Sequence, residues 1–168
     1  MARVLDHERT PPAGRSTSLR WVRKRPDAAA IDDAAAVACQ VAAGADVPRA
    51  ELGTAVRTVC ALLAFDHPGQ TVELRVPPFA AVQAGSGDRG AHTRGTPPNV
   101  VETDARTLLL LASGTLSWAA ALAEHRVRAS GVHSDIGDWF GCLPVQPINI
   151  VPPVVPYVHD QDDDLPPR

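Results

Sequence analysis

Hydrogen-bonding side chains gather in one short stretch of the second half of the chain. The group consists of His92, Thr93, Arg94, Thr96 and Asn99. An arginine presents a fork of donors that suits a carboxylate or a phosphate. His92, Arg94 and Asn99 are therefore candidate polar anchors for an anionic head group at the mouth of a pocket. The alternative is an ordinary loop, rich in glycine and proline, whose side chains bond their own backbone.

Two other patterns contain the letters of a catalytic or nucleotide-binding site but not its context. Ser130, His133, Ser134 and Asp135 include the residue types of a hydrolytic triad, but triad members converge from distant parts of a chain. Residues 85–90 match G-x-G-x-x-G, which binds a dinucleotide when its last glycine opens a helix. Here another glycine and two prolines follow instead. We expect a hairpin turn at 85–90, and a helix cap at 134 or 135.

The histidines and cysteines have no spacing typical of a metal or redox site. None of the six histidines pairs with another at i, i+4, and none lies at zinc-site spacing from a thiol. The three cysteines form no C-x-x-C pair and are expected to be reduced. The sequence therefore predicts a non-catalytic protein with no metal site and no cofactor.

Large apolar side chains are the best candidates for the walls of an apolar ligand pocket. They are Leu108, Leu111, Trp118, Leu122, Ile136, Trp139 and Phe140. Small-molecule sites are mostly apolar, with a few polar groups that fix the orientation of the ligand. Trp139 and Phe140 together are candidates for a lid over such a pocket. For each residue taken singly, an ordinary place in the core is the alternative.

Composition excludes several classes of protein. The formal net charge of −3 argues against a generic nucleic-acid binder, which carries a basic excess. No stretch approaches the roughly 20 apolar residues of a transmembrane helix. The first 25 residues contain no apolar core of a signal peptide. We therefore expect a cytoplasmic protein with no specific nucleic-acid partner and no transmembrane segment.

Helical and extended patterns alternate in groups, and these elements must position the candidate side chains. Helices are predicted at 27–43, from a cap at Asp46, with Pro48 in the first turn, to a stop at Pro68-Gly69, from 103 or 104 through the leucines 108–111, and from 115 or 117 to 122. A last short helix would hold Ile136, Trp139 and Phe140. Strands are predicted at 72–76, 79–83, 91–94, 99–102 and 127–130. Clustered strands with helices on one face make an α+β fold.

The chain divides at two compositional breaks. Residues 1–26 are polar and basic and show no periodicity, which predicts a flexible N-terminal arm. Residues 144–168 hold seven of the sixteen prolines and carry Asp160 and the aspartates 162–164 near their end. This composition predicts a Pro-rich, acidic-ended tail, a candidate docking segment for a protein partner. Residues 27–143 are expected to form one domain.

Four short stretches carry a resemblance to a known family. They are V-V-E-T-D at 100–104, the leucines 108–111, S-G-T-L-S-W-A-A-A at 113–121 and R-V-R-A-S-G at 126–131. Together they resemble the sterol carrier protein type 2 (SCP2) family, although Ser113 stands where threonine is usual. Residues 76–83 and 92–99 are similar to its actinobacterial branch, the bacterial SCP orthologues.

This resemblance implies a twisted, mostly antiparallel, five-stranded sheet that helices cover on one face, with an apolar tunnel between the two layers. It also implies non-catalytic binding or transfer of a sterol, a fatty acid or an acyl-CoA. Two alternatives stay open. The scaffold acts as a protein-interaction module, or it is an accessory domain of a mycothiol-dependent isomerase-like enzyme, as related domains are.

Overall fold

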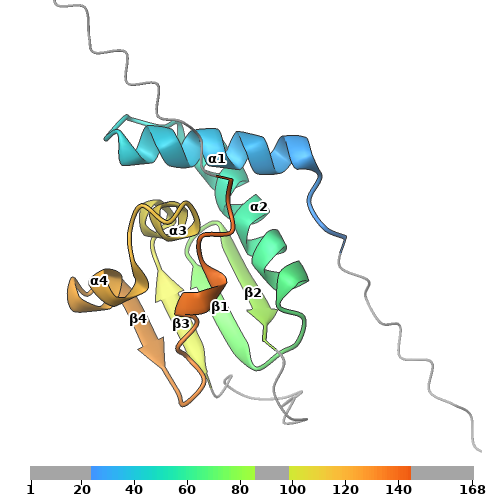
Figure 1. Cartoon of the computed structure of the whole chain (residues 1–168), viewed down its shortest axis with the longest axis vertical. Coiled ribbons are helices and arrows are strands. Elements are labelled where there is room, and N and C mark those ends of the chain that lie inside the picture. Colours follow the sequence, from blue (N-terminus) through green and yellow to red (C-terminus); the bar gives the residue numbers. More distant parts are fainter. Residues whose placement is uncertain (1–23, 86–98, 145–168) are drawn as a thin grey trace, which may run out of the picture.

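Helices and strands alternate in groups in the computed structural model, which describes residues 24–85 and 99–144 (Figure 1). In chain order they are α1 (Ala28–Ala42), α2 (Arg49–Asp66), β1 (Val72–Val76), β2 (Ala80–Ala84), β3 (Val100–Thr103), α3 (Ala105–Ala112), α4 (Trp118–Ala123) and β4 (Val127–Ser130). One turn of 3₁₀ helix, η1 (Gly137–Trp139), follows β4. The expected α+β class is confirmed.

The four described strands form one sheet in the order β2-β1-β3-β4. β1 and β2 are antiparallel neighbours joined by a tight turn, in which the Phe79 amide donates to the Val76 carbonyl over 2.9 Å. β3 pairs with β1 in parallel, and Leu74 lies opposite Val101. β4 closes the sheet antiparallel to β3.

The expectation of five strands and mostly antiparallel pairing is not confirmed. The described part of the sheet has four strands and is mixed, because β2 takes one side of β1 and β3 takes the other side in parallel. The strand expected at 91–94 lies outside the described residues. So does most of the hairpin turn expected at 85–90, of which only Gly85 is described.

Three helices begin at side-chain caps, Asp27, Asp104 and Ser117, of which the sequence had indicated the last two. Asp27 Oδ1 accepts a hydrogen bond from the Ala30 amide over 2.9 Å at the start of α1. Asp104 Oδ1 accepts from the Thr107 amide over 3.0 Å at the start of α3. Such caps satisfy backbone donors that have no partner inside the helix. They therefore fix where each helix leaves the preceding strand or turn.

The start of α2 differs from the prediction. Its first residue is Arg49, and Pro48 precedes it without any side-chain cap. Proline supplies a suitable φ angle and lacks the amide that would otherwise need a partner. Asp46, the expected cap, lies instead 3.8 Å from Arg106 Nη2 in an exposed ion pair.

The core lies between one face of the sheet and the helices α2 and α3. Along β1, Val72, Leu74 and Val76 are at most 2% exposed, while the side chains between them are half-buried, as the alternating pattern predicted. α1 packs across α2 and α3 on the side away from the sheet (Figure 1). None of the described helices is long and apolar enough to cross a membrane.

The segment after β4 is not the short helix that was expected. It makes one 3₁₀ turn at Gly137–Trp139, and Phe140 is already extended, with φ −87° and ψ 173°. The Gly141 amide then donates to the Leu111 carbonyl over 3.2 Å, and the Leu143 amide to the Ala112 carbonyl over 3.0 Å. The backbone thus leaves helical geometry to bond the end of α3.

Candidate functional site

Two aromatic rings, those of Trp118 and Phe140, pack together where α4 meets the segment that follows β4. Trp118 is the first residue of α4, and its ring stacks on Phe140 with the centroids 5.6 Å apart and the planes at 22°. Gly137 lies against the same indole, because a Cβ built on Gly137 would come within 2.8 Å of Trp118 Cδ1. The absence of a side chain at 137 is therefore what lets η1 approach α4.

Trp139 points to different neighbours. Its indole stacks on the His67 ring with centroids 4.5 Å apart and planes at 10°. Gly85 lies beside it, and the Gly85 amide donates to the His67 carbonyl over 2.8 Å. Trp139 thus fastens η1 to the ends of α2 and β2, while Phe140, its neighbour in sequence, faces α4.

The aliphatic candidates divide between core and surface. Leu108, Leu111 and Ile136 are at most 1% exposed and belong to the main core. Leu122 is 37% exposed on α4. The structure therefore brings Trp118 and Phe140 together above the buried leucines, and it leaves Leu122 at the surface.

One buried donor in this region has no acceptor. Trp118 Nε1 is the only buried side-chain nitrogen or oxygen without a hydrogen-bond partner in the described parts of the chain. Buried indole N–H groups usually find a partner. This donor is therefore a feature that the packing alone does not explain.

Of the three predicted polar anchors, His92, Arg94 and Asn99, the structure describes only Asn99. Asn99 is 2% exposed, and its amide bridges two loops. Asn99 Nδ2 donates to the Thr71 carbonyl over 2.8 Å, and Asn99 Oδ1 accepts from the His133 amide over 2.9 Å. Both partners are backbone groups, so this side chain positions the start of β3. His92 and Arg94 lie outside the described residues.

Ser134 and Asp135, two of the residues that match a hydrolytic triad by type, make hydrogen bonds within their own turn. Ser134 Oγ donates to the Gly131 carbonyl over 2.7 Å, and Asp135 Oδ1 accepts from the Gly137 amide over 3.3 Å. These bonds shape the turn between β4 and η1. The loop expected there is confirmed, but the expected helix is reduced to the 3₁₀ turn η1, which begins after Ile136 without a side-chain cap.

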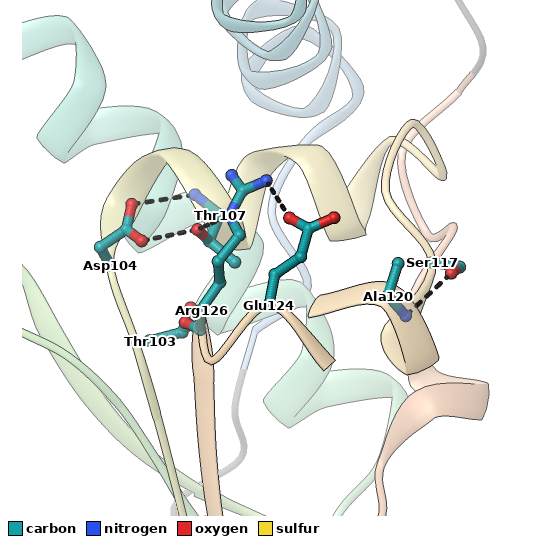
Figure 2. A network of polar contacts seen from close by, with 7 residues as sticks. All are labelled: Thr103, Asp104, Thr107, Ser117, Ala120, Glu124 and Arg126. Atoms are coloured by element: carbon teal, nitrogen blue, oxygen red, sulfur yellow. Dashed lines mark hydrogen bonds and ion pairs between the residues drawn. The ribbon is translucent and has the colours of Figure 1, made fainter. Parts of the chain in front are cut away.

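A polar network that the sequence did not single out joins α3 to β4 (Figure 2). Thr107 Oγ1 donates to Asp104 Oδ2 and accepts from Arg126 Nε over 3.2 Å. Arg126 Nη1 also lies 3.5 Å from Glu124 Oε2. Thr107 is fully buried, which makes it the bridge between an exposed carboxylate and a guanidinium. An aspartate three residues before a threonine at a helix start was the available signal.

An open depression of about 440 Å³ adjoins this network, at the end of β3 and the beginning of β4. Its lining mixes acids with bases, including Glu102, Asp104, His125 and Arg126. On the face of the sheet away from the described helices, Arg75 Nε lies 2.6 Å from Glu73 Oε1. That hydrogen bond and the charge of Glu73 raise the pKa of Arg75. The mixed charges do not select an anion or a cation.

Two further depressions lie on the surface of the helices. One, of about 450 Å³, runs between α1 and α2, and the other, of about 480 Å³, lies between α2 and β2. None of these three depressions is lined by the aliphatic and aromatic candidates named from the sequence. In the described parts of the chain, no three metal-ligating side chains gather in one place.

Two of the cysteines belong to the apolar interior. Cys60 is 1% exposed, and burial, with a smaller contribution from Cys142, raises the pKa of its thiol to about 12. Burial also raises the pKa of the Cys142 thiol to about 11. Both thiols are therefore protonated at neutral pH, which makes them poor nucleophiles.

Comparison with known proteins gives one clear result. The family model described as "Bacterial SCP ortholog" matches residues 48–145, which include every described element except α1. No curated protein matches the chain. The match covers more than half of the chain and includes the buried leucines, the aromatic pair and the polar network, so the chain belongs to the bacterial SCP ortholog family, with a sterol-carrier-like scaffold.

Proposed function

We propose that this domain binds an apolar ligand of the sterol, fatty-acid or acyl-CoA type and does no chemistry on it. The ligand would lie between the sheet and α3, against Leu108 and Leu111. Membership of the sterol-carrier-like family supports the ligand class. The leucines supply the apolar wall that such a molecule needs, because burial of apolar area drives its transfer from water.

The observation that carries this proposal is the aromatic pair of Trp118 and Phe140. Both rings are half-buried and pack on the core from the outside. Phe140 is held by a short segment whose backbone bonds to α3 come from Gly141 and Leu143. Displacing this segment would expose the part of the core next to α3. When the segment returns, the two aromatic rings would again bury a large apolar area, which favours the closed position.

In this proposal the segment that carries η1 and Phe140 is a lid over the core next to α3, and Trp139 would hold it closed. Its stack on His67 ties η1 to the end of α2, so the lid opens only when that contact breaks. His92 and Arg94 remain proposed contacts for a head group. Asn99 would support them by holding the start of β3 through its two backbone bonds.

Titration with cis-parinaric acid, a fluorescent fatty acid, tests the proposal. We expect saturable binding with energy transfer from tryptophan, and competition by sterols or acyl-CoA. Trp139→Ala should weaken binding while the far-ultraviolet circular dichroism is unchanged. Val132→Ala is the matched control, because Val132 is 91% exposed in the turn before η1. Absence of saturable binding would overturn the proposal and favour a protein-interaction module.

A further inference from the structure

The indole N–H of Trp118 is fixed in place and has no acceptor among the described residues. Trp118 opens α4, and Ser117 Oγ caps that helix by accepting from the Ala120 amide over 3.2 Å (Figure 2). Phe140 stacks on the ring and Gly137 lies against its Cβ, Cγ and Cδ1 atoms. Rotation of the indole would break this stack, so the donor cannot readily turn toward water.

The choice of tryptophan at this position is informative. A phenylalanine would supply a stacking ring without a polar atom, as Phe140 does on the other side of the pair. A buried donor without an acceptor lowers stability, whereas the same donor with an acceptor restores it. A bound molecule that supplies the acceptor would explain both why the N–H group is buried and why the residue is a tryptophan and not a phenylalanine.

We infer that Trp118 Nε1 donates a hydrogen bond to a neutral oxygen of the bound ligand, such as a ketone, ester or thioester carbonyl or a hydroxyl. The inference rests on the proposed function and adds the chemical class of the ligand's polar group. A single N–H donor satisfies one carbonyl oxygen. A buried carboxylate needs several donors or a cation, and the ring faces of Trp118 and Phe140 are negative in potential.

Nuclear magnetic resonance of the full chain with ¹⁵N-labelled tryptophan tests this contact directly. The chain has three tryptophans, Trp21, Trp118 and Trp139, so three indole signals are expected. The probes are methyl undecyl ketone, tridecane and laurate, which differ mainly in their oxygen atoms. We expect the ketone to move the Trp118 indole proton downfield and to slow its exchange with water. Tridecane should bind without this downfield shift.

Trp118→Phe removes the N–H group and keeps a stacking ring. We expect it to weaken ketone binding roughly fivefold, which corresponds to one net hydrogen bond, and to leave tridecane binding nearly unchanged. If this variant does not fold, Trp21→Phe and Trp139→Phe still identify the Trp118 signal by elimination. The wild-type titration then decides the question without it.

Three contradicting outcomes are distinguishable. Saturable binding of all three probes with the same small shift at Trp118 would overturn the inference and leave the proposed function standing. Tighter binding of laurate than of the ketone, with a larger shift at Trp118, would overturn the choice of a neutral oxygen. If none of the probes binds, both the proposed function and the inference fail.

Discussion

Thr107 receives a hydrogen bond from Arg126 across 3.2 Å, which links the first turn of α3 to the residue before β4. Thr107 Oγ1 donates its own hydrogen bond to Asp104 Oδ2, so one fully buried hydroxyl bonds two charged groups. The backbone on this side is joined as well, because Thr103 Oγ1 donates to the Arg126 carbonyl over 2.9 Å. These bonds set the angle at which α3 leaves β3.

Thr107→Val should destabilise the fold, because it keeps the shape of the side chain and removes both hydroxyl bonds. The variant loses two hydrogen bonds to charged groups and leaves Arg126 Nε without its acceptor. We therefore expect a loss of about 1–3 kcal/mol in the free energy of unfolding. Urea denaturation measures it. Thr107→Ser is the matched control and should retain most of the stability. Equal losses in the two variants would show that the methyl group matters more than the hydroxyl.

Gly137→Ala should disturb the aromatic pair. The new Cβ would lie 2.8 Å from Trp118 Cδ1, so the ring or η1 must move. Overpacking of this kind predicts a loss of about 1–3 kcal/mol in stability and a shift in tryptophan emission. Gly114→Ala is the control. Gly114 has a φ of 72°, and no atom of the described residues lies within 4 Å of its Cβ position, so backbone strain should reduce stability there without changing the emission.

Asn99→Ala should lower the melting temperature even in the absence of ligand. It removes the acceptor of the His133 amide and the donor to the Thr71 carbonyl. Each buried backbone group left without a partner predicts a loss of roughly 1–3 kcal/mol. Differential scanning calorimetry checks this. Unchanged stability combined with weaker binding of an anionic lipid would instead identify Asn99 as a ligand anchor.

Stability should fall at alkaline pH because of two buried thiols. Unfolded cysteines ionise near pH 9.0, whereas burial raises the pKa of Cys60 to about 12 and that of Cys142 to about 11. Above pH 9 the unfolded chain releases protons that the folded chain keeps, so unfolding becomes easier as pH rises toward these values. The expected slope is roughly 1.4 kcal/mol per pH unit for each thiol.

Urea denaturation between pH 8 and pH 11 measures this slope. The double variant Cys60→Ala and Cys142→Ala should be less stable at neutral pH, because it leaves small cavities. It should also lose most of the alkaline slope. If the slope is the same with and without the two thiols, other groups cause the alkaline loss and the thiol explanation is wrong.

Sequence signals that act over a few residues predicted local structure well. Asp104 and Ser117 were candidates for the start of a helix, and each caps the helix that follows it. The alternation in β1 predicted which side chains enter the core. Such signals say which face of a strand is buried. They do not say which strand lies beside it, so the parallel pairing of β1 with β3 was not foreseen.

Contacts between distant segments decided the rest of the candidate site. Trp139 and Phe140 were expected to act together in one helix. Their side chains diverge, because Gly137 lets η1 pack on Trp118 while His67 takes the Trp139 ring. The pairs Thr71 with Asn99 and Thr107 with Arg126 are separated by 28 and 19 residues. No short motif encodes such pairs.

The parallel pairing of β1 with β3 divides the domain into two comparable halves. The first half contributes α1, α2 and the β1–β2 hairpin, and the second contributes α3, α4 and the antiparallel β3–β4 pair. They join along one seam of strands, with α1 and α2 laid over α3. The partners across this seam lie 27 residues apart in sequence, about as far as the partners of the antiparallel β3–β4 pair, so neither pairing is local. Non-local strand pairing is slow, so formation of the β1–β3 and β3–β4 pairs should set the folding rate of the domain.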